Sequence, residues 1–460
     1  MSKENFNKLI VLGLDGGTFD VLDPLIEKGI MPNLEHIIEN GVSSTMMSTF
    51  PPLTGPAWVS MATGKNPGKT GITDFINIVQ GPTDKKFVSS EDYRVNGAFW
   101  DILNDHGYKT YLIGYPMLYP YYEINGVIVS GWGVSDDGKL AYPPEIENRI
   151  EEISEGYINH VPWRTKKEYR DDKKILIDDL STMIKKQKKV VKDLINDEWD
   201  LFMYVCSASD FIQHALWDEI KDKDSLNHER VLDLWSEIDD IIGILMDKEE
   251  NIFLVSDHGF GPLKNKFLPS KWLKENGYLV TGKKNNCVEL ASTIPSNIDL
   301  DNSAAFSHST GIHGEIHVCI DEGKRKIIKK IKKEMKEYSE MKDFKLNIYE
   351  KNELYEGCRL DEIADILFNV DDYKCNISSS SLDGEIYEKN YKFKIRSGNH
   401  REQGIFCAYG PDIKSNEKLD DVKIYDFAPT LVHFYDIPVP DDMDGHVLED
   451  IFDKDSEIEK

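Results

Sequence analysis

Two apolar segments of the chain end in side chains that could bind a metal ion. In KLIVLGLDGG (8–17) the apolar run is followed by Asp15, and in NIFLVSDHG (251–259) it is followed by Ser256, Asp257 and His258. In open α/β sheets, ligands bind outside the carboxyl ends of the strands, and carboxylate oxygens and imidazole nitrogens suit Zn²⁺ or Mn²⁺. An acidic residue before glycine is also ordinary turn chemistry. Taken alone, each segment indicates either a metal site or a polar turn.

Two more segments carry residues of the same kind. SDFIQHALWD places Asp210 and His214 at positions i and i+4, on one face of a helix, and SGNHREQG sets His400 in a glycine-flanked loop. Asp210 could instead cap its helix, and the histidines could belong to the core or the surface. Chance rarely gathers three carboxylates and three imidazoles at the strand ends of one sheet. Together the residues favour a site for two divalent ions.

A threonine in the segment TFPPLTGPAWVSMATGKNPGKTGITDF is a candidate nucleophile. Thr54 follows a proline pair, and a helix through Ala57 to Ala62 can begin there. Its hydroxyl and the first free amides of that helix would then face an anion together. The alternative is that Thr54 only caps the helix. Coordination by a metal ion would make this weak nucleophile usable.

The elements that must position these residues form an alternating pattern. Helical stretches such as 171–195, with apolar residues recurring every three and four positions, lie between short apolar runs. This alternation predicts an α/β fold whose central, mostly parallel β-sheet is sandwiched by helices. The predicted strands are 8–17, 110–116, 126–132, 201–210, 251–259 and 404–412.

The character of the chain changes between 262 and 395. This region has a lysine-rich helical run at 323–338 and a polar tract at 376–385. The basic run is interpreted as a solvated helix face. We therefore expect a catalytic core of two parts, 1–261 and 396–460, interrupted by an inserted smaller subdomain.

Composition limits the partners and the compartment. The net charge of −27 over 460 residues argues against a nucleic-acid duplex or an anionic membrane as the main partner. No signal peptide or membrane-spanning run is predicted. The cysteines lack CxxC spacing, which disfavours a disulfide framework, so the expected location is the cytoplasm. They are Cys206, Cys287, Cys319, Cys358, Cys375 and Cys407.

The motifs together resemble the alkaline phosphatase superfamily, and most closely its type I phosphodiesterase/nucleotide pyrophosphatase branch. LDGGTFD, PPLTGPAWVSMATGKNPGKTGITDF, SASDFIQHALWD, VSDHGFGP, SGNHREQGIFCAYGPDI and IYDFAPTLVHFYDIPVPDDMDGHVL occur in order along the chain. The resemblance implies two metal ions, usually zinc, with manganese as an alternative. One ion would be bound by Asp15, Thr54, Asp257 and His258, and the other by Asp210, His214 and His400.

The chain also departs from the branch pattern. Thr70 stands where branch members often have a histidine. Asn66 and Arg401 are candidates for binding a phosphate oxygen, and Arg401 could instead be an exposed arginine that pairs with a surface acid. Trp58 could offer a stacking surface to the substrate or could pack in the core.

The function predicted from these residues is metal-dependent hydrolysis of a phosphodiester or a nucleotide pyrophosphate through a phosphothreonine. The substrate would be a small phosphate ester or a nucleotide. A phosphomonoesterase or phosphomutase on the same metal core is the first alternative, and an inactive metal-binding scaffold is the second. The sequence does not distinguish oligomeric states.

Overall fold

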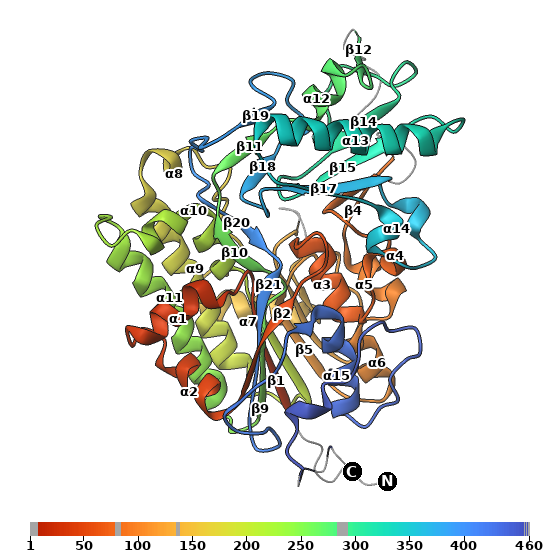
Figure 1. The fold of residues 1–460 in the computed structure, drawn as a ribbon. Coiled ribbons are helices and arrows are strands. Elements are labelled where there is room, and N and C mark those ends of the chain that lie inside the picture. The colour runs from red at the N-terminus through yellow and green to blue at the C-terminus, as the bar shows by residue number, and fades with distance from the viewer. Residues whose placement is uncertain are drawn as a thin grey trace.

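A large β-sheet runs through the computed structural model, which describes residues 8–78, 84–134, 139–282, 293–454, 456 and 458. Its strand order is β22-β2-β21-β9-β1-β8-β5-β6-β7, with β23 beside β2 (Figure 1). The strands are β1 (Leu9–Leu14), β2 (Val42–Met47), β5 (Thr110–Tyr115), β6 (Gly126–Ser130), β7 (Ala141–Tyr142), β8 (Leu201–Cys206), β9 (Asn251–Val255), β21 (Gln403–Tyr409), β22 (Glu417–Lys418) and β23 (Val422–Lys423).

The centre of this sheet is parallel. β1 pairs in parallel with both β8 and β9, and β5 pairs in parallel with β8 and β6. Parallel strands with both faces covered are expected to be apolar throughout, and every residue of β1, β8 and β9 is buried. The edge is mixed, because β21 runs antiparallel to β9 and to β2.

Helices form a layer on each face of the sheet. One apolar core joins the sheet to α1 (Phe19–Glu27), α2 (Pro32–Asn40), α7 (Pro144–Ser154), α9 (Lys173–Leu194), α10 (Ala208–Lys221) and α11 (His228–Met246). The other joins it to α3 (Thr54–Thr63), α5 (Ser90–Asn96), α6 (Phe99–Asp105) and α15 (Phe427–Phe434). Between α7 and α9 lies the short α8 (Glu168–Asp171).

Smaller sheets lie above the large one in Figure 1. They comprise a four-stranded sheet of order β14-β15-β17-β16, a three-stranded sheet and a β10-β20 ribbon. Their strands are β10 (Gly259–Pro262), β11 (Asn265–Phe267), β14 (Ala305–His308), β15 (Gly314–Val318), β16 (Leu346–Glu350), β17 (Ile366–Val370), β18 (Cys375–Ile377), β19 (Tyr387–Glu388) and β20 (Gly398–Arg401). The helices here are α12 (Pro269–Glu275), α13 (Lys324–Lys342) and α14 (Lys351–Leu354). Two strand pairs, β3 (Ile76–Ile78) with β4 (Lys85–Phe87) and β12 (Val280–Thr281) with β13 (Ile298–Asp299), and α4 (Pro67–Thr70) complete these elements.

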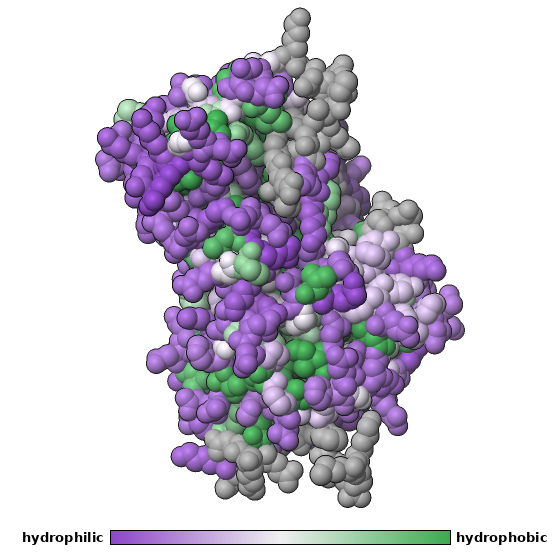
Figure 2. Space-filling model, turned by 90° about the vertical axis from the view of Figure 1, so that its right-hand side faces the viewer, coloured by the Kyte–Doolittle hydropathy of each residue, from purple (hydrophilic) through white to green (hydrophobic). Residues whose placement is uncertain are grey.

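The observed architecture confirms the predicted α/β class. All six predicted strands belong to the large sheet, as β1, β5, β6, β8, β9 and β21. The lysine-rich run is α13, which buries Ile328, Ile331 and Met335 on one face. On the face drawn in Figure 2, hydrophilic residues cover most of the surface and apolar ones form separate patches. No helix among the described residues is long and apolar enough to cross a membrane. The five described cysteines are free, and Cys287 lies outside the described residues.

Candidate active site

The register of the central strands brings two carboxylates together. Gly13 pairs with Val255 of β9, so that Asp15 and Asp257 both emerge at the carboxyl edge of the sheet. The backbone N–H of Gly16 donates to Asp257 Oδ1 at 3.1 Å, which orients that carboxylate. Both side chains are buried, Asp15 at 3% and Asp257 at 0% exposure. Parallel pairing thus places two acids side by side away from water.

His258 completes this first cluster. Its Nε2 lies 3.5 Å from Asp15 Oδ1, 3.3 Å from Asp257 Oδ2 and 3.3 Å from Thr54 Oγ1. Thr54 is the first residue of α3, and the N-cap of that helix is Leu53 rather than Thr54. The structure therefore brings Asp15, Thr54, Asp257 and His258 to one point.

The second cluster comes from a helix and a ribbon. Asp210 and His214 lie one turn apart on α10, with Asp210 Oδ1 3.4 Å from His214 Nε2. The β10-β20 ribbon directly follows His258 and pairs Phe260 with His400. This pairing carries His400 to the site, with its Nε2 3.3 Å from Asp210 Oδ1 and 2.9 Å from His214 Nε2.

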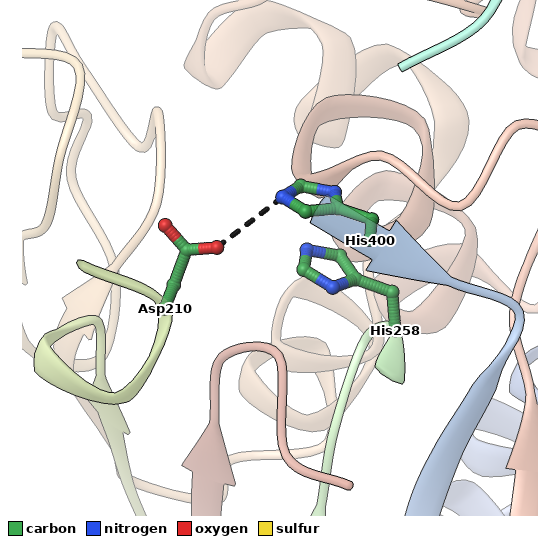
Figure 3. A group of neighbouring side chains, drawn as sticks. All are labelled: Asp210, His258 and His400. Carbon is green, nitrogen blue, oxygen red and sulfur yellow. Dashed lines mark ion pairs between the residues drawn. The ribbon is translucent and has the colours of Figure 1, made fainter. Parts of the chain in front are cut away.

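The two clusters touch through their histidines. The rings of His258 and His400 stack with centroids 3.6 Å apart, and Asp210 faces them from α10 (Figure 3). Metal-compatible groupings are Asp15–Asp257–His258 and Asp210–His258–His400, which share His258. All seven residues predicted as metal ligands therefore lie in one continuous site.

The three imidazoles share one hydrogen-bonding pattern. Nδ1 of His214, His258 and His400 lies 3.2, 3.1 and 2.9 Å from the carbonyl oxygens of Gly398, Gly259 and Pro52. A carbonyl oxygen only accepts, so each Nδ1 carries the hydrogen. In a neutral ring, Nε2 then presents its lone pair to the site, as in histidines that bind metal ions.

Burial controls the charge of the site. It raises the pKa of Asp15 and Asp257 well above the usual range, with mutual repulsion between carboxylates adding to the effect. Burial also raises the pKa of Asp210 to about 7. Because burial lowers the pKa values of the three histidines well below 6.5, these rings are neutral at pH 7.

The donor set fits divalent cations. Asp15 Oδ1, Asp210 Oδ1 and Asp257 Oδ2 are buried without a hydrogen-bond partner, and they are the atoms that face the histidine lone pairs. Ligand atoms about 2.0–2.1 Å from a tetrahedral ion stand roughly 3.3–3.4 Å apart, and the carboxylate–imidazole separations are 3.3–3.5 Å. A cation would relieve the repulsion between these oxygens and lone pairs.

Trp58 has a definite place beside the site. It is fully buried, and its Nε1 donates to Asp15 Oδ2 at 3.4 Å. A Cβ on Gly13 would come within 2.6 Å of its ring, so glycine at that position makes room for the indole. Trp58 positions a carboxylate and packs in the core.

The two residues predicted to bind a phosphate oxygen, Asn66 and Arg401, are not among the residues that line the pocket over the site. Asn66 caps α4 by accepting from the N–H of Gly68 and donates to Asp444. Arg401 donates to the backbone carbonyls of Tyr373, His400 and Pro262. These partners give both side chains structural positions.

The pocket over the two clusters adds residues that the motifs did not indicate. Arg164 and Trp163 come from the loop between α7 and α8, and Arg396 precedes β20. No spacing in the sequence singles them out, because they lie outside any recognisable motif. The lining residues are Asp15, Leu53, Thr54, Phe75, Trp132, Trp163, Arg164, Ser207, Asp210, Phe211, His214, Thr310, Ile312, Arg396 and His400.

A second buried group of ionisable residues supports the pocket wall. Asp74 Oδ2 accepts from the hydroxyl of Thr310 at 3.0 Å and lies 3.6 Å from His308 Nε2. His313 Nε2 stands 4.0 Å from Asp74 and 3.2 Å from Glu315. These contacts connect the loop after α4 to the β14–β15 hairpin.

Comparison with known proteins gives a family and a fold. The sequence model of the family described as type I phosphodiesterase / nucleotide pyrophosphatase matches residues 9–398. Human ectonucleotide pyrophosphatase/phosphodiesterase 5 matches with a TM-score of 0.55 and 17% identity, over 97% of this chain and 100% of that chain. The murine protein of that name, as an inactive threonine-to-alanine variant in complex with AMP, gives a TM-score of 0.58 and 16% identity over the same shares. No curated protein matches the chain.

Proposed function

The chain belongs to the type I phosphodiesterase/nucleotide pyrophosphatase family of hydrolases, and from this premise we propose that it forms a covalent phosphothreonine at Thr54. Its substrate would be a phosphodiester or a nucleotide pyrophosphate. The observation that carries the proposal is the position of Thr54 Oγ1, 3.3 Å from His258 Nε2 at the edge of the carboxylate cluster.

Two divalent cations, zinc or alternatively manganese, complete the proposed site. Asp15, Thr54, Asp257 and His258 would hold one of them, and the second cluster, Asp210, His214 and His400, would hold the other. When bound, such ions lower the pKa of a hydroxyl and neutralise the charge of a phosphate. The buried carboxylate oxygens without partners supply the donors that this requires.

The chain itself positions the nucleophile. Thr54 opens α3, and its backbone N–H and that of Gly55 have no backbone acceptor among the described residues. Unpaired amides at a helix N-terminus bind anions, because they add hydrogen bonds to the positive end of the helix dipole. Thr54 would thus offer its hydroxyl to phosphorus while these amides hold a phosphate oxygen.

The reaction would proceed in two balanced steps. The Thr54 hydroxyl gives up its proton to water as its oxygen bonds to phosphorus, and the bond to the leaving oxygen breaks with its electron pair departing on the leaving group. Water then attacks the phosphothreonine, the bond from phosphorus to the Thr54 oxygen breaks, and this oxygen takes up a proton, which regenerates the hydroxyl. Attack by Thr54 on one side of phosphorus requires the leaving group on the opposite side.

The murine relative supports this assignment. It was captured with AMP as an inactive variant in which a threonine is replaced by alanine. A nucleotide substrate and a threonine nucleophile for this chain both agree with that description.

Replacement of Thr54 tests the proposal directly. Thr54→Ala should reduce turnover of bis(p-nitrophenyl) phosphate by at least about 10³-fold, because it removes the hydroxyl that lies at the first cluster. Thr54→Ser is the matched control and should retain measurable turnover. Near-normal turnover by Thr54→Ala, in protein that still binds metal, would exclude the phosphothreonine.

A further inference from the structure

Two arginines, Arg164 and Arg396, line the pocket. Burial lowers the pKa of Arg396, and the positive charge of Arg164 lowers it further. No carboxylate among the described residues forms an ion pair with either guanidinium. Two neighbouring cations of this kind bind anions, since an oxyanion relieves their repulsion and accepts their hydrogen bonds.

Neutral groups hold Arg396 in place. Its Nε donates to the carbonyl oxygen of Gly398, Nη1 to Asn376 Oδ1 and Nη2 to Asn399 Oδ1. Asn399 is itself tied to the backbone of Tyr373. A guanidinium has five N–H groups, so two of them, one on each terminal nitrogen, stay free for a ligand while the charge is not neutralised.

Arg164 is held by stacking. The Trp163 ring packs on His214 with centroids 4.8 Å apart and an interplanar angle of 21°. The guanidinium carbon of Arg164 lies 5.6 Å from the centroid of the same ring. Trp163 thus links this exposed arginine to a residue of the second cluster and leaves its N–H groups without a protein acceptor among the described residues.

The two arginines share the pocket with the nucleophile and with the second cluster. The pocket lining includes Thr54, Asp210, His214 and His400 as well as Arg164 and Arg396. The Trp163 ring beside Arg164 stacks on His214, and the Gly398 carbonyl that accepts from Arg396 Nε also lies 3.2 Å from His214 Nδ1. Both arginines are therefore tied to the side of the site that His214 occupies.

We propose that Arg164 and Arg396 form a subsite for a phosphate of the leaving group, so that the enzyme selects diphosphate substrates over simple diesters. This inference rests on the proposed function, because attack by Thr54 places the leaving group on the far side of phosphorus. When the bridging P–O bond breaks, its electron pair remains on the departing phosphate. The two guanidiniums face the charge that develops there.

The test compares two substrates that transfer the same thymidylyl group. TTP releases pyrophosphate, whereas the p-nitrophenyl ester of TMP has a leaving group that is uncharged in the substrate. Arg164→Gln, and separately Arg396→Gln, should lower the ratio of kcat/KM for TTP to that for the ester by about 10- to 100-fold. Arg94→Gln is the matched control, because Arg94 is exposed, pairs with Glu91 and lies outside the pocket lining.

The ratio of kcat/KM for TTP to kcat/KM for the ester decides the outcome. An unchanged ratio, whether both activities persist or both fall together, would overturn the subsite. Arg164→Gln is the decisive variant, since Arg396 also holds Asn399 and its loss could disturb folding.

A binding experiment separates this proposal from the proposed function. In metal-loaded Thr54→Ala protein, calorimetry with inorganic phosphate and with pyrophosphate needs no turnover. Adding Arg164→Gln should weaken pyrophosphate binding about tenfold and phosphate binding much less. Equal weakening of both ligands, or of neither, would refute the subsite even if the wild-type enzyme hydrolyses neither substrate.

Discussion

The cost of burying the Asp210 carboxylate should be measurable as a dependence of stability on pH in chelated protein. Burial raises the pKa of Asp210 from 3.8 to about 7. Between about pH 4 and pH 7 the folded chain therefore binds a proton that the unfolded chain does not, and stability falls as pH rises. A difference of about three in pKa amounts to on the order of 4 kcal/mol by pH 8.

Asp210→Asn isolates this effect, because the amide keeps the shape and does not titrate. With chelator at pH 8, the variant should unfold at a higher temperature than the wild type, and at pH 4 the two should coincide. For a chain of 460 residues, about 4 kcal/mol corresponds to a difference of roughly 4 °C in the unfolding midpoint. Differential scanning calorimetry at the two pH values measures it.

With added zinc at pH 8, the wild type should unfold at a higher temperature than Asp210→Asn. The wild type gains stability by binding the cation, by about 4 kcal/mol at a thousand times the dissociation constant, while the variant lacks one ligand. Asp224→Asn, a change at an exposed acid, should follow the wild type throughout. If Asp210→Asn were less stable than the wild type in chelator at both pH values, the proposed cost of burying the Asp210 carboxylate would be refuted.

Three further outcomes are expected. Dialysis against a chelator should abolish release of nitrophenolate from bis(p-nitrophenyl) phosphate, and Zn²⁺ or Mn²⁺ should restore it; full activity in metal-free protein would exclude metal assistance. Asp74→Ala removes the buried partner of His308 and should lower the unfolding free energy by about 1–3 kcal/mol, measured by urea titration; an unchanged value would show that the contact is not stabilising. Gly259→Ala would put a Cβ 1.8 Å from the carbonyl oxygen of Gln403, so both the midpoint temperature of unfolding and the turnover should fall. Gly282→Ala, whose added Cβ has its nearest neighbour 3.6 Å away, is the control and should change neither.

The first cluster could be predicted because it depends on local sequence and on one rule of sheet geometry. An apolar run followed by Asp15 or Asp257 marks a strand end, and parallel strands end at the same edge. Asp210 and His214 needed only the helical spacing. The convergence of these residues follows from topology, and the observed pairing of β1 with both β8 and β9 supplies that topology.

The parts that escaped prediction depend on pairings between distant segments. β2 (VSSTMM) has no continuous apolar run, and it alternates buried with half-buried residues between β21 and the edge. His400 reaches the site through the antiparallel β10-β20 ribbon, which the motif did not reveal. Arg164 and Arg396 lie in irregular segments, where no periodicity relates a residue to its neighbours in space.

The same atoms link the stability of the site to its proposed chemistry. Each imidazole donates its Nδ1 hydrogen to a backbone carbonyl oxygen, so its Nε2 lone pair faces the carboxylates. Turning a ring over would satisfy a carboxylate but would leave a buried carbonyl without its donor, and that exchange brings no net gain. The backbone therefore fixes a cluster of carboxylate oxygens and nitrogen lone pairs, and only protons or cations can bind to these atoms. At neutral pH this arrangement favours cations, because protons become scarce while the carboxylates stay fixed at contact distance.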